Sequence, residues 1–376
     1  MNYDCGETDT RKSARVANIQ SLRAVSFRNY ESVSFEFSPR HNLLIGSNGV
    51  GKSNVLEAIN LISTTRSFRG AKDKDMIKFR AESAVIRGES GQSSYEIRIP
   101  ARGRRTVSLN GTTLPKVSDL LGRLPSVCFS TADMEIIRGD GSDRRRFLDL
   151  ELCQASVKYL VSHATYTSAL RHRNALLKDI KHGSATRDQL QPWDQTLAES
   201  CASVRRMRLN YISELAPICA EYHLSLTDGA ETMQTKYIQN DEGCDASSIM
   251  ELLFSQQSTD LAAGHTTVGA HRDELEIRVN QDHAKPYSSQ GQQRTSVLSL
   301  KLAQLRWWRD RMGVMPILLL DDIFSDLDEK RRSRVLSVSG EVGQVVITAT
   351  DANSAHIDEL VTPAVFTMKS GEWVRQ

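Results

Sequence analysis

Residues 46–53 read Gly46-Ser47-Asn48-Gly49-Val50-Gly51-Lys52-Ser53, and this stretch decides the fold that the sequence predicts. It matches the phosphate-loop pattern G-x-x-x-x-G-K-[ST] at every defined position. The apolar run 43–45 before it predicts a buried strand, and Val55, Ile59 and Ile62 after it recur at helical spacing. Strand, glycine loop and helix in this order predict a nucleoside-triphosphate site in an α/β fold. The alternative, a glycine-rich turn without a ligand, is disfavoured by these flanks.

The phosphate loop assigns a role to each of its residues. We expect the backbone N–H groups of residues 46–51 to surround phosphate oxygens at the positive N-terminal end of the following helix. Lys52 is expected to reach the β- and γ-phosphates and to take part in catalysis, and the Ser53 hydroxyl to coordinate Mg²⁺. The expected cofactors are therefore ATP and Mg²⁺.

The composition is that of an ordinary globular protein. The chain has 376 residues, of which 39% are hydrophobic and 25% charged, and its formal net charge is +2. A nucleic-acid surface would therefore have to be a local patch rather than a property of the whole molecule. No run of about eighteen apolar residues predicts a membrane span, and residues 1–15 lack the apolar segment of a secretory signal. These features lead us to expect a cytoplasmic protein.

The cysteines are scattered and form no C-x-x-C pair, which excludes the common zinc-finger spacings and disfavours a disulfide framework. They are Cys5, Cys128, Cys153, Cys201, Cys219 and Cys244.

Hydrophobic periodicity divides the chain into four parts. Residues 1–16 are expected to be a flexible extension, with order beginning near Ile19. Residues 17–142 form the first part of a head: alternation along 33–37 predicts a hairpin before the phosphate-loop strand, and later alternation predicts further antiparallel strands. Residues 143–255 lack strand signals and are expected to be a helical insertion. Residues 256–376 return to strand patterns and complete the head.

Two long helices are expected in the insertion. One covers about 156–178. The other carries a seam, interrupted only by Arg208, that is typical of the packing face of a helical hairpin rather than of an extended coiled coil. The seam consists of Leu197, Cys201, Val204, Tyr211, Leu215 and Ile218.

A second motif follows late in the chain, where the apolar run 317–320 ends in Asp321-Asp322. This is a Walker B pattern, in which a buried strand delivers a carboxylate at its C-terminal tip. We assign Asp321 to the Mg²⁺ shell. Asp322 is expected to orient or deprotonate the attacking water. Alone, the same pattern would also fit a core strand that meets a turn.

A third motif, Ser289-x-Gly291-Gln292, opens an apolar helix. It resembles the signature of ABC-type ATPases, in which the signature of one subunit closes on the γ-phosphate held by another. We therefore expect Ser289, Gly291 and Gln292 to complete a nucleotide site across a homodimer. The segment 325–328 resembles the D-loop that lies at the seam of such dimers.

Seven blocks of the sequence occur in a characteristic order. They are FRNY at 27–30, GSNGVGKSNVLEAI at 46–59, RSFRG at 66–70, RRRFLD at 144–149, GAHRDEL at 269–275, SSQGQQRT at 288–295 and LLLDDIFSDLD at 318–328. Together these blocks resemble the RecF family of bacterial recombination-mediator ATPases. The resemblance implies a head like that of Rad50 and SMC proteins, with a compact helical arm. It also implies ATP-dependent dimerisation, slow ATP hydrolysis, binding of DNA, and action with RecR and RecO at gapped DNA.

Two departures from the ABC pattern are visible. The strand after Walker B carries no switch histidine, so Thr348 or Thr350 would have to act on the γ-phosphate side. The Q-loop glutamine is absent as well, and Asp133 stands at the corresponding junction. Both departures agree with weak hydrolysis.

Basic clusters are concentrated in the insertion and after the RSFRG block. They would either form solvated helix faces or contact DNA phosphates without reading sequence. No recognition-helix or stacking-aromatic motif is visible. His271-Arg272-Asp273 is expected to be a structural or dimer-seam element rather than a catalytic trio. The clusters are 144–146, Arg171/Arg173, Arg205/Arg206/Arg208 and Lys72/Lys74/Lys78.

Two other functions remain open: the ATP-binding subunit of a membrane transporter, and a short SMC-type tether. The missing histidine, the large insertion and the FRNY block weigh against the first. The short seam weighs against the second.

Overall fold

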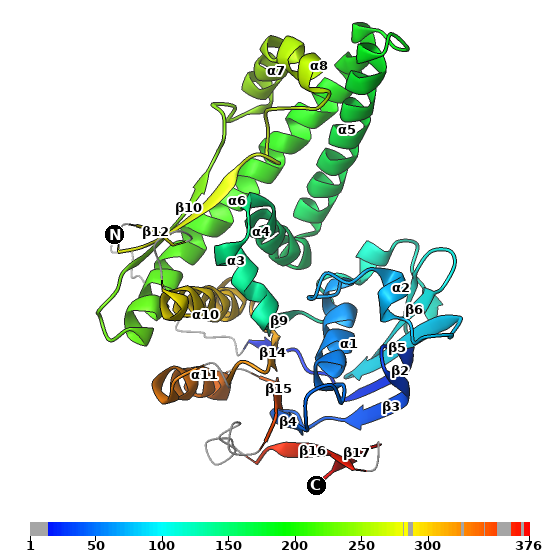
Figure 1. Ribbon diagram of the computed structural model, residues 1–376, viewed down its shortest axis with the longest axis vertical. Helices are drawn as coiled ribbons and strands as arrows, with labels where there is room; N and C mark the ends of the chain where they lie inside the picture. Colours follow the sequence, from blue (N-terminus) through cyan, green and yellow to red (C-terminus); the bar gives the residue numbers. More distant parts are fainter. Residues whose placement is uncertain are drawn as a thin grey trace, which may run out of the picture.

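The computed structural model describes residues 14–280, 282–284, 289–324, 327–341, 343–351, 362–369 and 372–376. It shows an α/β head from which a helical arm projects, as the sequence predicts (Figure 1). Within the described residues, each helix is too short or too polar to cross a bilayer.

The head is built on a six-stranded sheet in the order β17-β16-β4-β15-β14-β9, parallel except for the edge strand β17. Neighbouring residues of its strands face opposite sides. Leu318 and Leu320 enter one hydrophobic core, whereas Leu319 enters the other. The strands span β4 His41–Ile45, β9 Ser126–Phe129, β14 Ile317–Asp321, β15 Val345–Ala349, β16 Ala364–Lys369 and β17 Glu372–Arg375.

The helix α1 (Lys52–Thr64) covers one face of this sheet and packs on its other side against an antiparallel sheet, in the order β3-β2-β5-β6-β7-β8. The first two strands form the predicted hairpin. An Asn110-Gly111 turn, a dipeptide typical of tight hairpins, joins β7 to β8, with φ of 51° and 79° at its two residues. The strands span β2 Ser21–Phe27, β3 Tyr30–Glu36, β5 Ser83–Ser90, β6 Ser93–Pro100, β7 Thr106–Leu109 and β8 Thr112–Thr113.

The arm contains the two long helices that the sequence predicts, α5 and α6, packed against each other. Arg208, which interrupts the predicted seam, is buried like its neighbours because it bonds to other arm residues. The helices around the arm span α4 Gly141–Ala155, α5 Val157–Lys181, α6 Gln191–Leu226, α7 Ala246–Ser255 and α8 Gln257–Ala263.

The expectation that 143–255 is purely helical is wrong in one respect. Residues Met233–Ile238 form strand β10, which pairs with β11 (Glu274–Val279) and, through it, with β12 (Asp282–His283). The sequence did not predict this strand because its buried and exposed positions do not alternate cleanly between apolar and polar residues. Its partner strand also lies about forty positions away in the sequence. The domain boundaries at 143 and 255 stay a prediction.

The beginning of order is also earlier than expected. Strand β1 (Arg15–Val16) pairs in parallel with β13 (Val314–Met315), and Arg15 N–H donates to Gly313 O at 2.9 Å. A two-residue strand held by backbone hydrogen bonds has no hydrophobic periodicity that would predict it from the sequence. The rest of the predicted extension, residues 1–13, lies outside the described residues.

The remaining helices and turns have the following bounds. They are α2 Asp73–Met76, α3 Glu135–Arg138, α10 Gln290–Trp307, α11 Glu329–Glu341, three 3₁₀ turns at Val117–Leu120, Thr131–Met134 and Arg187–Leu190, and a π-turn at Trp308–Met312.

A buried carboxyl, Glu151 of α4, lies where the arm meets α10. Gln304 Nε2 donates to its Oε2 at 2.7 Å, and the indole N–H of Trp308 donates to its Oε1. Burial raises the pKa of Glu151 to about 7, although the Trp308 hydrogen bond acts in the opposite direction. The native state therefore retains a proton that the unfolded chain loses at lower pH.

We expect Glu151 to make the protein less stable as pH rises. Because the folded-state pKa of about 7 exceeds the ordinary value of 4.5, stability is lost from about pH 4.5 upward and the loss is complete above pH 7. Glu151→Gln should remove this dependence, so its free energy of unfolding should gain up to about 3 kcal/mol over wild type between pH 5 and pH 8. Denaturant unfolding at several pH values measures it. Glu199→Gln, on the exposed side of α6, is the control, and parallel pH profiles for wild type and Glu151→Gln would contradict the assignment.

Candidate nucleotide-binding site

The phosphate loop lies between the C-terminal end of β4 and the first residue of α1. Gly49 and Gly51 have φ of 87° and 111°, in the region that favours glycine. A Cβ on Gly51 would lie 2.5 Å from the Tyr30 hydroxyl oxygen, so no side chain fits there. Residues 47–49 of the loop are exposed.

The start of α1 has the features of an anion site. Its N-cap, Gly51, provides no side-chain acceptor for the first N–H groups of the helix. Lys52 Nζ donates to the backbone oxygens of Gly46 at 2.5 Å and Ser47 at 3.2 Å, which holds the ammonium over the loop. Burial lowers the pKa of Lys52, and the carboxylates of Asp322 and Asp321 act in the opposite direction. The fold thus brings the lysine and both predicted aspartates into one electrostatic neighbourhood.

Asp321 is the last residue of β14, as the Walker B pattern predicts. The Thr348 hydroxyl, from the neighbouring strand β15, donates to Asp321 Oδ1 at 3.0 Å and accepts from Asp322 N–H at 2.9 Å. Asp322 has a φ of 52°, an uncommon value for a non-glycine residue that often marks a functional turn. Of the two threonines considered for the γ-phosphate side, Thr348 thus holds the aspartates, whereas the Thr350 hydroxyl donates to Asp351 Oδ2 at 3.1 Å.

Residues of the FRNY block form hydrogen bonds to the backbone of the phosphate loop. Tyr30 Oη donates to Gly51 O at 2.9 Å, and Asn29 Nδ2 donates to Val50 O at 3.3 Å. Arg28 forms a bidentate pair with the fully buried Glu57 of α1, with N–O distances of 2.7 and 2.6 Å. The hairpin turn therefore fixes both the loop and the helix that follows it.

Arg69 is a site residue that sequence reasoning missed. Its Nη1 donates to Asn54 Oδ1 at 3.0 Å, and its Nη2 lies 4.0 Å from Asp321 Oδ2. It belongs to the RSFRG loop, which is tied to α1 because the Ser67 hydroxyl donates to Glu57 Oε1 at 2.5 Å. Membership of a block shared with the RecF family was the one signal in the sequence that pointed to it.

The signature residues lie at the start of α10. Ser289 is the N-cap: its hydroxyl accepts from Gln292 N–H at 3.2 Å, and Gln292 Oε1 accepts from Ser289 N–H at 2.8 Å. Gln292 Nε2 also donates to Glu231 Oε1 at 2.9 Å, so its side chain is held within the chain. Ser289 and Gly291 are exposed.

The structure does not bring the signature to the phosphate loop of the same chain. Helix α10 packs in the core that includes the arm, whereas α1 packs in the core on the other face of the sheet. Figure 1 shows the two helices on different sides of the strands β14 and β15. Ser288 and the first two residues of the predicted D-loop, Ser325 and Asp326, lie outside the described residues.

Asp133, at the position of the missing Q-loop glutamine, contacts the signature helix. Its Oδ1 lies 2.7 Å from Lys301 Nζ of α10, and its Oδ2 accepts from Ser130 N–H at 2.8 Å. A carboxylate at this junction therefore connects the end of β9 to α10.

The donor set fits a magnesium nucleotide. Mg²⁺ in such sites takes few protein ligands and several from phosphates and water. Within the described residues there is no cluster of three His, Cys, Asp or Glu side chains that would hold a metal without a nucleotide. Asp321 offers a carboxylate, and the Ser53 hydroxyl has no hydrogen-bond partner in the part of the chain that the structure describes.

Comparison with known proteins shows the family. Residues 18–370 match the family described as the RecF/RecN/SMC N-terminal domain. The DNA replication and repair protein RecF of Agathobacter rectalis is 37% identical over 358 residues, covering 94% of this chain and 98% of that protein. The chain belongs to the RecF family.

Solved structures of RecF-family proteins have the same fold. The recombination mediator protein RecF with ATP, of the RecFOR pathway, matches with a TM-score of 0.89 and 30% identity over 97% of this chain and 99% of that chain. An Smc head from Pyrococcus furiosus, with 16% identity, has a TM-score of 0.56 over 95% of this chain and 96% of that one. The predicted ABC-type ATPase head of the SMC kind is thereby confirmed.

The basic clusters of this RecF-family chain are not equivalent, and three arginines considered for DNA are wrong candidates. Arg173, Arg205 and Arg208 are buried and paired with carboxylates. Their periodic position on the inner faces of α5 and α6 placed them in the core. Arg171 and Arg206, on the outer faces, are exposed.

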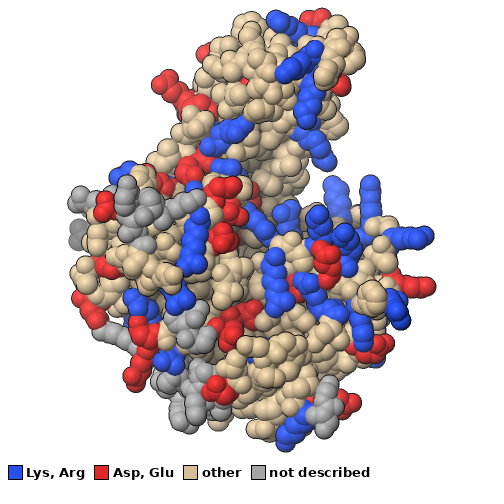
Figure 2. All heavy atoms as spheres, viewed as in Figure 1, with Lys and Arg blue, Asp and Glu red and all other residues tan. Residues whose placement is uncertain are grey.

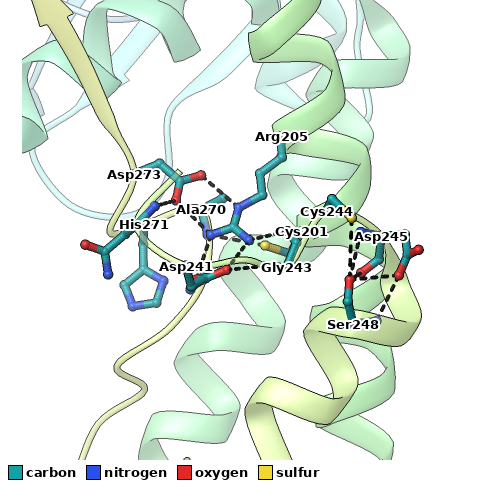
Figure 3. A network of polar contacts seen from close by, with 12 residues as sticks. Cys201, Arg205, Asp241, Gly243, Cys244, Asp245, Ser248, Ala270, His271 and Asp273 are labelled. Carbon is teal, nitrogen blue, oxygen red and sulfur yellow. Dashed lines mark hydrogen bonds and ion pairs between the residues drawn. The ribbon is translucent and has the colours of Figure 1, made fainter. Parts of the chain in front are cut away.

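Two residues of the GAHRD block, Asp273 and His271, are held by contacts within this chain. Arg205 of α6 pairs with Asp273 at 2.7 Å and with Asp241 at 2.6 Å (Figure 3). Burial alone would raise the pKa of Asp241, but Arg205 holds it below its ordinary value. The network thus fixes segment 269–273 against the arm.

Both ring nitrogens of His271 have hydrogen-bond partners within the chain. Its Nδ1 lies 2.7 Å from the Tyr166 hydroxyl, and its Nε2 lies 3.1 Å from Thr266 O. Burial lowers the pKa of His271 to about 4, so the ring is neutral near pH 7. These contacts leave no role for it as a general base.

We expect Arg205→Met to destabilise the protein by about 3–5 kcal/mol, because it leaves two buried carboxylates without their partner. Denaturant unfolding measures the loss. Arg206→Met, the exposed neighbour on the same helix, is the matched control and should change stability by less than about 0.5 kcal/mol. Equal losses in the two variants would show that the pairing with Asp241 and Asp273 is not what stabilises the arm.

Proposed function

We propose that this RecF-family chain is an ATP-controlled switch of DNA replication and repair, which dimerises on ATP, closes on DNA at gaps and reopens when ATP is slowly hydrolysed. The open phosphate loop, with its uncapped helix N-terminus, is the feature that supports ATP binding. The names of the relatives, a DNA replication and repair protein and an ATP-bound recombination mediator, support the biological setting.

Each residue of the half-site then has a task. The N–H groups of 46–51 bind the phosphates, and Lys52 neutralises the β- and γ-phosphate oxygens. Ser53 and Asp321 would hold Mg²⁺, which spreads the negative charge of the triphosphate when bound. Arg69, 4.0 Å from Asp321, adds a second cation at the same carboxylate.

Asp322 is the residue that we assign to the attacking water. It accepts the water proton as the oxygen bonds to the γ-phosphorus and the bond to the bridging β–γ oxygen breaks, which yields ADP and phosphate. Thr348 fixes the position of Asp322 through its backbone N–H. The absence of a switch histidine at this position supports slow rather than fast turnover.

The requirement for a second subunit rests on one observation: the exposed signature start lies across the sheet from the phosphate loop of its own chain. Such a surface is satisfied when Ser289 and Gly291 of one copy meet the nucleotide of the other. Gln292 contributes as part of the cap that holds this helix start. Two equivalent sites then form across a symmetric homodimer.

The DNA surface is proposed to be the hollow between α5 and the antiparallel subdomain. It has a volume of about 740 Å³ and is lined by Arg66, Arg146 and Arg171. All three are exposed, and Figure 2 shows Lys and Arg side chains gathered where the arm meets the subdomain. The acids beside them, Asp73 and Asp149, already pair with arginines, which leaves a net positive surface for phosphates without base recognition.

RecR and RecO are the proposed partners, because the ATP-bound relative is a protein of the RecFOR pathway. The transporter-subunit alternative has no support from the relatives reported above. A tether alternative is disfavoured because α5 and α6, at 25 and 36 residues, form a compact arm.

We expect Ser289→Arg to block ATP-dependent dimers while the monomer still binds ATP, because a large cation at the helix start meets the partner's site. Sizing with a slowly hydrolysed ATP analogue, together with a nucleotide-binding assay, measures both properties. Ser255→Arg, at an exposed end of α7, is the control and should dimerise normally. Lys52→Ala should lose both properties; ATP-dependent dimers of either site variant would refute the composite site.

We expect the triple change Arg66→Ala, Arg146→Ala and Arg171→Ala to weaken duplex and single-stranded DNA binding alike. The slope of log affinity against log salt should fall by about 2–3, since each lost phosphate contact removes about 0.7–0.9. Fluorescence anisotropy at several salt concentrations measures it. The control carries the same charge change on the exposed strands β2, β5 and β6, at Arg23, Arg87 and Arg98. An equal effect in both triples would contradict the hollow as the DNA surface.

A further inference from the structure

Phe79 is exposed to an unusual degree. Its relative exposure of 85% is the highest of the large hydrophobic side chains in the described part of the chain. A fully solvated phenylalanine gains nothing from burial, so its position is not explained by the stability of the head. It lies in the loop between α2 and β5.

The backbone holds Phe79 at the tip of a tight turn. Ala81 N–H donates to Lys78 O at 2.9 Å, which closes a four-residue turn. Arg80, the third residue of the turn, has a φ of 68°, where a type II turn normally has glycine or asparagine. Lys78 N–H donates to Ser26 O at 2.8 Å, so the turn is attached to β2. The ring is therefore presented on a fixed and mildly strained support.

One cation lies against the ring. The guanidinium of Arg80 lies 5.2 Å from the centroid of Phe79 and covers one face. Lys74 of the neighbouring α2 and its N-cap residue Lys72 are exposed. Asp73 between them pairs with Arg105, and both of these residues line the basic hollow described above. The turn is thus continuous, through α2, with the surface proposed to bind DNA phosphates.

We propose that Phe79 stacks on an unpaired base of single-stranded DNA whose backbone follows α2 into the hollow. The inference rests on the proposed DNA-binding function and names the part of it that recognises unpaired strands. An aromatic ring with a basic surround is the usual platform for this contact, and stacking accepts any base. A duplex offers no free base face to the ring, so Phe79 distinguishes single strands from duplexes.

The test compares Phe79→Ala with wild type by anisotropy on a labelled oligothymidylate and on a duplex of equal length. Affinity for the oligothymidylate should fall by about 5- to 100-fold, as expected for one stacked base. Duplex affinity should stay within twofold. The salt dependence of both should be unchanged, because no phosphate contact is lost.

Three further variants separate stacking from general effects. Phe79→Trp should keep single-strand affinity, whereas Phe79→Leu, which is apolar but has no π-face, should behave like Phe79→Ala. Phe254→Ala removes another exposed phenylalanine, on α7, and should have no effect.

The inference is overturned if Phe79→Ala binds the oligothymidylate like wild type, if it loses duplex binding equally, or if it alters only ATP affinity or self-association. Wild type that binds neither DNA would instead refute the proposed function.

Discussion

Parallel pairing of β14 with β15, and of β15 with β4, is the constraint on which the nucleotide site depends. Since parallel strands end at the same edge of a sheet, the pairing places the phosphate loop after Ile45, the carboxylates at Asp321 and Asp322, and Thr348 within one small region. The interaction continues beyond the strands, because Gly46 N–H donates to Ala349 O at 3.3 Å. Segments about 270 residues apart in sequence thereby form one site.

The same sheet also separates the phosphate loop from the Ser289 end of α10, the two parts of the composite site proposed above. Side chains that alternate along the strands enter two hydrophobic cores, one that includes α1 and one that includes α10. The phosphate loop and the Ser289 end of α10 therefore lie on different sides of the sheet in a single chain. The contact of Asp133 with Lys301 joins the strand edge near the site to the signature helix at 2.7 Å. In the homodimer proposed above, this contact would connect one nucleotide to the surface that meets the partner.

The arginines of the arm fall into two groups, those buried in ion pairs and those exposed on the surface. Arginines on the inner faces of α5 and α6 bond to buried carboxylates, so that loss of either partner would leave an uncompensated buried charge. The same ion pairs neutralise carboxylates such as Asp149, whose negative charge would otherwise offset the positive charge of the exposed arginines in the hollow. The positive surface beside the arm is therefore a consequence of how its interior is paired.

The sequence by itself determined the features that depend on neighbours along the chain. The loop 46–53, the strand ending at Asp321, the cap at Ser289 and the two arm helices each follow from local spacing, because backbone conformation and burial periodicity are set within a few residues. Only the tertiary structure decided which charges are free. Arg205 and Arg206 are adjacent and chemically identical, yet one is buried between two aspartates and the other is solvated. The same holds for Arg69 beside Asp321 and for the exposure of Phe79, since each depends on contacts between segments that the sequence keeps far apart.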